Sequence, residues 1–256
     1  MSRSNPVDGI KNPATRWFDW AGGNEGGYFK FYDKDAKQNV KVPLPFTFLL
    51  LDELSTIKGW HEASESGIYS NEVRDTRQET LVVRAFKGGE LASGIYTSIR
   101  DSVIAKGGHY VASLYLAYKE GDELRIGNLS LKGAAAGAWM EFKRASPSRK
   151  DSAGKSVRGY FVDAVKIAEF EQAKKGATVY RVPKFALSPV SEATNQQAAA
   201  LDLELQSFLS EYLKRPKAEA ATPAQAQEDP PQDNPQDSSR HFDDMADDLP
   251  FRDEPF

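Results

Sequence analysis

The sequence predicts a mainly β protein with a few accessory helices. Short segments in which apolar and polar residues alternate recur along the chain, and this period of two is typical of strands with one buried face. Few segments show apolar residues at helical spacing, and strands and helices do not alternate regularly, as they would in a parallel α/β fold. With 256 residues, the chain has room for one large domain or two small ones.

The expected strands are separated by polar or glycine-rich turns, which favour hairpins. Such turns are expected at 33–38, at 120–122 and at 174–176. The expected strands are 28–32 with its return through 42, 46–51 with an extension through 60, 68–73, 80–86, 110–118, 124–131, 160–169 and 178–185.

Apolar residues at helical spacing predict helices over 93–106, over the alanine-rich 134–140 and over 191–215. The last of these carries one apolar stripe and ends at Pro216. The stripe consists of Ala198, Leu201, Leu205, Phe208, Leu209 and Tyr212. It either packs on the body of the protein or serves dimerisation, so a homo-oligomer stays open as an alternative.

The first expected strand shows the alternation most clearly. Its period of two places Phe29 and Phe31 on one face and Tyr28, Lys30 and Tyr32 on the other. We expect the phenylalanines in the core. The other face combines two rings that can stack on bases with a cation that can pair with phosphate, a combination suited to single-stranded nucleic acid. A row of this kind is also ordinary on a solvated sheet.

Residues 1–25 are polar and rich in glycine and proline, which predicts a loop, yet they contain Trp17, Phe18 and Trp20. Aromatic side chains this close together need a surface on which to lie. Trp17 and Trp20 therefore either cap the edge of the core or stack on the bases of a bound strand.

Residues 143–158 form the most basic window of the chain and are expected to be a loop rich in Ser, Gly and Pro, with Asp151 as its single acid. The basic residues are Lys143, Arg144, Arg149, Lys150, Lys155 and Arg158. A loop of this composition contributes little to packing, whereas each cation can displace condensed counterions from a phosphate. A merely solvated loop is the alternative.

Composition narrows the class of protein. The chain has no cysteine, which excludes disulfides, cysteine–zinc sites and thiol catalysis. No N-terminal stretch is typical of a signal peptide and no apolar run is long enough to span a bilayer, so we expect a soluble protein of the cytoplasm, the host cytoplasm if a phage encodes it.

Charge is divided unevenly along the chain. Residues 1–215 carry 30 basic and 26 acidic residues, a net +4, whereas residues 216–256 carry 3 basic and 11 acidic residues, a net −8. A mildly basic body joined to an acidic segment is typical of a protein that binds polyanions.

No motif predicts an enzyme, a metal site or a cofactor. His61, His109 and His241 share no metal-ligand spacing, and the Gly-x-Ser-x-Gly nucleophile motif does not occur. Glu141 and Lys143 match a nuclease-like acid-x-Lys pattern, but such a triplet arises readily by chance. We expect neither catalytic residues nor a bound cofactor.

The last fifteen residues, 242–256, contain six acids and two Pro-Phe pairs. Such a segment has too little apolar surface to fold by itself. It is therefore either a solvating acidic tail or a docking segment whose rings enter a basic, apolar pocket of a partner. The preceding residues 216–241 are rich in Ala, Pro, Gln and Asp, and we expect a disordered linker there.

The ending resembles the acidic tip of bacterial and phage single-stranded DNA-binding proteins. Asp247-Asp248-Leu249-Pro250-Phe251 matches the family pattern of acids, an aliphatic residue, proline and phenylalanine. The last four residues, Asp253-Glu254-Pro255-Phe256, have Glu254 in place of the aliphatic residue. The resemblance implies that the tip recruits proteins of replication, recombination and repair, with the final phenylalanine in an apolar pocket and its carboxylate on a basic residue.

The order of short strands around one helix resembles an OB-fold, a small closed barrel that commonly binds single strands. We therefore expect an elaborated OB-like DNA-binding domain at 1–190, an amphipathic helix at 191–215, a linker at 216–241 and a partner-binding tip at 242–256. The tip is expected to lie on the basic surface until DNA displaces it.

The expected function is binding of single-stranded DNA without sequence preference. A strand-annealing or recombination mediator and an interaction adaptor without nucleic acid are the alternatives, and RNA also fits as the bound strand.

Overall fold

The computed structural model describes residues 11–151 and 153–215 and confirms a mainly β protein. The strands are β1 (Arg16–Ala21), β2 (Tyr28–Asp33), β3 (Gln38–Val42), β4 (Phe46–His61), β5 (Ser66–Ser70), β6 (Leu81–Ala85), β7 (Gly89–Gly94), β8 (Gly108–Glu120), β9 (Glu123–Lys132), β10 (Ser148–Lys150), β11 (Ser156–Arg158), β12 (Ala164–Lys175) and β13 (Thr178–Ser188). The helices are α1 (Tyr96–Ala105), α2 (Gly133–Ala145) and α3 (Glu192–Tyr212), with short 3-10 turns η1 (Glu62–Ser64) and η2 (Gly159–Phe161).

One large sheet organises these strands. Its strands follow each other in the order β3-β2-β1-β9-β8-β4-β5-β6-β7, and β12 pairs with β4 while carrying β13 on its other edge. All of these pairs are antiparallel except β1 with β9. The described strand pairs do not close into a ring, so the expected closed barrel is not confirmed. The short strands β10 and β11 form a hairpin of their own.

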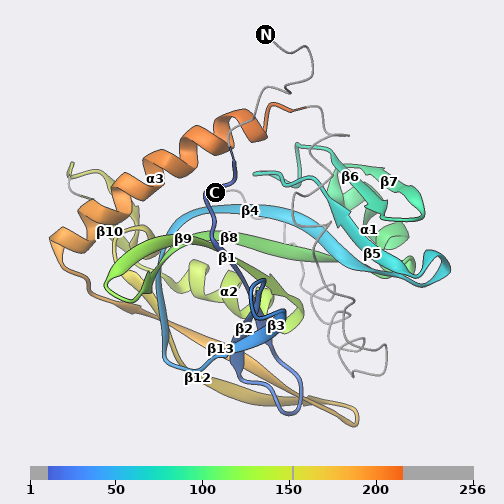
Figure 1. Ribbon diagram of the computed structural model, residues 1–256, viewed down its shortest axis with the longest axis horizontal. Helices are drawn as coiled ribbons and strands as arrows, with labels where there is room; N and C mark the ends of the chain where they lie inside the picture. The colour runs from blue at the N-terminus through green and yellow to red at the C-terminus, as the bar shows by residue number, and fades with distance from the viewer. Residues whose placement is uncertain (1–10, 152, 216–256) are drawn as a thin grey trace.

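Each face of the sheet carries an apolar core. On one face, Phe18, Phe29 and Phe46 pack with Trp139 of α2 and with residues of β12. On the other face, residues of β4, β8 and β9 pack under Leu205 and Phe208 of α3. Figure 1 shows α2 and α3 on the two sides of β8 and β9. A third cluster lies at the far end of the sheet, where α1 packs on β4, β5 and β6.

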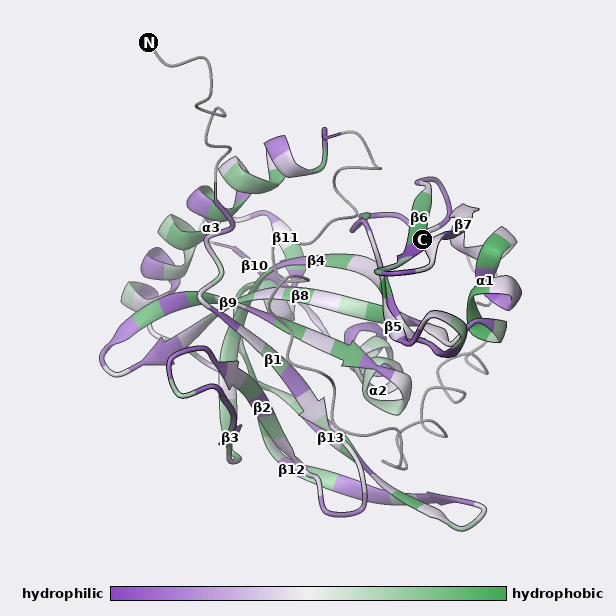
Figure 2. Ribbon diagram, turned by 45° about the vertical axis from the view of Figure 1, so that its right-hand side comes forward, coloured by the Kyte–Doolittle hydropathy of each residue, from purple (hydrophilic) through white to green (hydrophobic). Residues whose placement is uncertain are grey.

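The apolar stripe of the last predicted helix packs on the body of the protein. Ala198, Leu205, Phe208 and Leu209 are buried against the sheet, and Leu201 and Tyr212 lie beside them. Figure 2 shows the corresponding alternation of hydrophobic and hydrophilic bands along α3. The helix begins after Ser191, whose hydroxyl accepts a hydrogen bond from the backbone N–H of Thr194. The stripe is thus explained without a second copy of the chain.

Most predicted strands and helices are confirmed, and the exceptions are informative. Residues 16–21 were expected to be part of a loop but form β1, because β9 and β2 supply hydrogen-bond partners on both sides. Residues 89–94 form β7, where a break and the start of a helix were expected. Residues 143–158 contain the end of α2 and the β10–β11 hairpin instead of a continuous loop.

A set of hydrogen bonds connects β13 to the turn between β1 and β2. The backbone N–H of Arg181 donates to the carbonyl of Gly22 at 2.8 Å, and the indole N–H of Trp20 donates to the carbonyl of Arg181 at 2.8 Å. The guanidinium of Arg181 also donates to the carbonyl of Gly26. We call these contacts the Arg181 clasp.

The clasp is reinforced by an aromatic ring of β12. The guanidinium of Arg181 lies 4.9 Å from the centroid of the Phe170 ring. Gly27 passes so close to this ring that a Cβ atom at position 27 would lie 2.4 Å from it, and its φ of +91° also favours glycine. The turn and the β12–β13 ribbon are therefore fitted to each other. Figure 2 shows that the ribbon continues beyond the other strands.

None of the helices within the described ranges combines the length and the apolarity needed to cross a membrane. The expected linker at 216–241 and the expected tip at 242–256 lie outside the described residues.

We predict that Trp20→Phe lowers the free energy of unfolding by about 1 kcal/mol, because the ring volume is largely kept while the hydrogen bond to the Arg181 carbonyl is lost. Urea denaturation followed by circular dichroism measures the change. Trp17→Phe serves as the matched control and should have the smaller effect. Equal effects of the two substitutions would contradict a stabilising clasp.

Candidate nucleic-acid interface

The predicted alternation of β2 is confirmed. Phe29 and Phe31 are 0% and 6% exposed and belong to the core beside α2. Tyr28, Lys30 and Tyr32 point to the other face of the sheet and are partly exposed. One face of β2 is therefore apolar and buried, and the other face is accessible and carries two aromatic rings and a cation.

Residues of the neighbouring strands β1 and β3 extend this accessible face. Lys41 of β3 lies opposite Lys30 in the strand register, and its ammonium group is 4.7 Å from the centroid of the Tyr28 ring. On the other side, Trp17 of β1 is half-buried, and the ammonium group of Lys34 lies 6.0 Å from its ring centroid. We call the surface formed by these residues with Tyr28, Lys30 and Tyr32 the β1–β3 face.

Acidic residues also border the β1–β3 face. Asp19 is exposed and lies opposite Lys30 in the register of β1 and β2. The exposed Asp35 follows Lys34 in the β2–β3 turn, so Lys30, Lys34 and Lys41 are accompanied by two exposed carboxylates. The surface keeps an excess of positive charge, and its cations lie next to rings.

Trp20 does not belong to the β1–β3 face. It is three residues after Trp17 on β1, so the two rings point to opposite sides of the sheet. The Trp20 ring packs edge-on against Phe29 with centroids 4.9 Å apart, and its N–H is used in the Arg181 clasp. The expectation that Trp17 and Trp20 act together as stacking rings therefore does not fit their geometry, and Trp20 caps the edge of the core.

The basic window is a structured hairpin. Lys150 pairs with Ser156 and Ser148 with Arg158 in the antiparallel register. The turn is organised by Asp151, whose carboxylate accepts hydrogen bonds from the backbone N–H groups of Ala153 and Lys155 at 3.0 and 2.8 Å. The single acid of the window is thus used to shape the turn.

The basic residues of the window differ in their partners. Arg149 contacts Asp163 at 3.3 Å, and Arg158 donates to the carbonyl of Ser146 at 3.5 Å. Arg144, Lys150 and Lys155 are exposed. These residues therefore present charge to solvent around the hairpin.

Lys143 is different, because it forms an ion pair inside the fold. Its ammonium group lies 2.6 and 2.8 Å from the two carboxylate oxygens of Glu53 on β4, and the two side chains are 26% and 19% exposed. Burial raises the pKa of the neighbouring Tyr110 to about 12, and the charge of Glu53 adds to this shift. Because the Lys143 ammonium group is paired with Glu53, Lys143 is not part of the candidate interface.

The hairpin and the β1–β3 face are two separate surfaces, because Figures 1 and 2 show β10 beside α3 and away from β2 and β3. Tyr160, which follows the hairpin, packs on the core that contains Phe29 and Phe31. Tyr28, Lys30 and Tyr32 point away from that core. The sequence-predicted contacts are thus divided between two surfaces.

A buried polar cluster under α3 was not expected from the sequence. Glu72 accepts hydrogen bonds from the hydroxyls of Ser113 and Tyr115, the latter at 2.9 Å, and Tyr212 of α3 contacts the same carboxyl group. Removal of this carboxyl from water raises its pKa, while the hydrogen bonds and the charge of Lys58 oppose the shift. The contacts join α3 to the sheet, which indicates a structural role.

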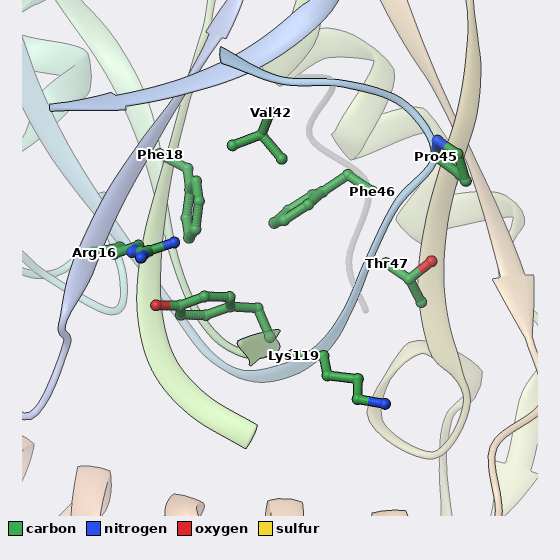
Figure 3. A pocket seen from close by; sticks show the side chains of 8 residues that line it. Arg16, Phe18, Val42, Pro45, Phe46, Thr47 and Lys119 are labelled. Atoms are coloured by element: carbon green, nitrogen blue, oxygen red, sulfur yellow. The ribbon is translucent and has the colours of Figure 1, made fainter. Parts of the chain in front are cut away.

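An open pocket of about 330 Å³ lies where β1, the β3–β4 connection and the end of β8 meet. Figure 3 shows Phe18 and Phe46 side by side, with Arg16 and Lys119 on two sides of them. The rings of Phe18 and Phe46 are only 2% and 6% exposed, and Arg16 is paired with Glu120 and lies 4.3 Å from the centroid of Phe31. The pocket therefore offers little free ring surface or unpaired charge.

No group of three or more His, Asp or Glu side chains suited to a metal ion occurs among the described residues. The tip residues 247–251 and 253–256 lie outside the described part of the chain. Comparison with known protein families, with curated proteins and with solved structures finds no match.

We predict that Lys143→Ala lowers the free energy of unfolding by about 1–3 kcal/mol, because it leaves the half-buried Glu53 carboxylate without its partner. Lys155→Ala is the matched control on the exposed hairpin and should change stability by less than about 0.5 kcal/mol. Urea denaturation of both variants at neutral pH checks the difference. A Lys143→Ala variant as stable as Lys155→Ala would contradict the structural role of the ion pair.

Proposed function

We propose that this chain binds single-stranded DNA without sequence preference through the β1–β3 face. The observation that carries the proposal is the division of β2, in which Phe29 and Phe31 are buried while Tyr28, Lys30 and Tyr32 remain accessible beside further cations. Rings that alternate with cations on a sheet surface are the arrangement with which many proteins bind unpaired bases and their phosphates.

The same chemistry supports a preference for single strands. A ring can stack only on a base whose face is free, and the bases of a duplex already stack on each other. Every base has such a face, so stacking tolerates any sequence. Lysine ammonium groups contact phosphate, which carries no sequence information. Nothing else on the β1–β3 face resembles a set of side chains arranged to distinguish one base edge from another.

We also propose that the domain is an opened and elaborated relative of the OB barrel. The Arg181 clasp supports this interpretation. The strand pairs run from β1 through β9, β8, β4 and β12 to β13, and the clasp joins β13 back to the turn after β1. The clasp thus brings β13 back to the β1–β2 turn by hydrogen bonds and not by a strand pair, since both edges of β1 are taken by β2 and β9.

The acidic tip is the second part of the proposal. Asp247 to Phe251 and Asp253 to Phe256 would recruit replication, recombination or repair proteins, as the resemblance to the acidic tips implies. The net +4 of residues 1–215 and the net −8 of residues 216–256 favour an additional contact between the tip and the DNA-binding surface in the absence of DNA.

A strand-annealing mediator remains the second candidate, because it would use the same ring-and-cation surface. It would assemble on DNA into rings or filaments, so light scattering of the complex distinguishes the two. An adaptor without nucleic acid is the third candidate, and absence of binding to oligo-dT would favour it.

We predict that Tyr28→Ala and Tyr32→Ala each weaken binding to oligo-dT about 5- to 150-fold, the effect of losing one stacked base at about 1–3 kcal/mol. Fluorescence anisotropy at matched salt measures the dissociation constants for oligo-dT, oligo-U and a duplex. Tyr69→Ala is the matched control, because Tyr69 is a half-buried strand tyrosine that packs on Phe86, away from the β1–β3 face.

Failure of the unaltered protein to bind oligo-dT at low salt would overturn the proposed function. Equal losses in the Tyr28, Tyr32 and Tyr69 variants would overturn the assignment of the β1–β3 face. Comparable affinity for oligo-U would widen the proposed ligand from single-stranded DNA to single-stranded nucleic acid in general.

We further predict that deletion of residues 242–256 tightens oligo-dT binding at low salt and leaves it almost unchanged at high salt, because the deletion removes six acids that compete with phosphate. A chain in which the same six acids are replaced by their amides should behave like the deletion. Unchanged affinity at low salt would contradict competition by the tip.

A further inference from the structure

Phe161, at the end of η2, is the most exposed phenylalanine among the described residues. Its exposed fraction is 50%, compared with 43% for Phe86 and 36% for Phe170. An exposed large ring is unfavourable in water unless another molecule covers it. It also follows directly after the basic hairpin, a position that sequence patterns did not single out.

The ring of Phe161 is held in place by the fold. Its centroid lies 4.9 Å from that of Tyr160, which in turn packs 6.0 Å from Trp139 and 6.3 Å from Phe142 in the core. The short turn is fixed by hydrogen bonds from the backbone N–H groups of Val162 and Asp163 to the carbonyl of Gly159, at 3.0 and 2.8 Å. A ring positioned in advance loses little freedom when it stacks on a ligand.

The charges around Phe161 suit a polyanion. Phe161 is three residues after Arg158, so their Cα atoms lie within roughly 11 Å of each other. In the hairpin register, Arg158 is opposite Ser148 and Lys150 opposite Ser156, so the two cations lie on the same face of the hairpin. Both cations are exposed, whereas Arg149 on the alternate face is paired with Asp163.

The nearby acids are already used within the fold. The carboxylate of Asp151 accepts hydrogen bonds from backbone N–H groups of its own turn, and that of Asp163 contacts Arg149. Lys150, Lys155 and Arg158 are exposed. An exposed ring and three exposed cations within one short segment are the combination that binds a single strand, and a protein partner would gain less from so polar a hairpin.

We propose that the β10–β11 hairpin and η2 form a second single-strand contact, in which Phe161 stacks on a base and Lys150, Lys155 and Arg158 pair with phosphates. This inference rests on the proposed function, and it adds a surface separate from the β1–β3 face.

The test compares Phe161→Ala with Phe86→Ala, a matched variant at a similarly exposed phenylalanine of the far end of the sheet. Binding of the full chain to a 35-nucleotide oligo-dT is measured over a series of salt concentrations. Phe161→Ala should weaken binding about 5- to 150-fold at every salt concentration without changing the slope of log Kd against log salt, because no cation is lost. Lys155→Gln should instead reduce that slope by about 0.7.

A conservative variant provides an independent readout. Phe161→Trp should keep the affinity of the unaltered protein and add tryptophan fluorescence that the oligonucleotide quenches. If the chain binds and Tyr28→Ala weakens binding while Phe161→Ala behaves like Phe86→Ala, the second contact is wrong and the proposed function stands. If the unaltered chain does not bind the oligonucleotide at low salt, the proposed function itself fails.

Discussion

The Arg181 clasp is the constraint on which the remaining geometry depends. It joins the β1–β2–β3 end of the sheet to β13 by hydrogen bonds, in addition to the β1–β9 pair and the packing of Phe29 in the core. The clasp uses backbone carbonyls and an indole N–H, so it fixes distance and direction together. Because the clasp holds the turn that leads into β2, the directions in which the two faces of β2 point are fixed as well.

This constraint lets one strand serve the core and the surface at once. The apolar face of β2 is buried by neighbours of the same sheet and by α2, so burial of Phe29 and Phe31 stabilises the fold. The opposite face of β2 is not needed for the core, so Tyr28, Lys30 and Tyr32 can stay accessible. Lys41 and Lys34 lie over rings of this surface, where cation–π attraction holds them near the positions that a stacked base and its phosphate would take.

Local patterns in the sequence were sufficient for β2, for the β8–β9 hairpin and for the stripe of α3, because period and turn residues determine such elements. They failed for β1, whose partner β9 lies more than a hundred residues away in the chain. They also treated Lys143 like the other basic residues, although Glu53, 90 residues earlier, takes its charge. Phe161 was not singled out because it lay inside the strand expected at 160–169, whereas it belongs to η2, before β12 begins at Ala164.

The two surfaces imply how the proposed binding would be shared between stacking and charge. Lys30, Lys34, Lys41, Lys150, Lys155 and Arg158 could together neutralise about six phosphates, which corresponds to a slope of roughly −4 in log K against log salt. Such a charge term fades at physiological ionic strength, whereas stacking on Tyr28, Tyr32 and Phe161 does not depend on counterions. The cations would therefore attract a nucleic-acid strand, and stacking on the aromatic rings would keep it bound. Because each ring contributes only a modest share, the proposed complex could release the nucleic-acid strand one contact at a time.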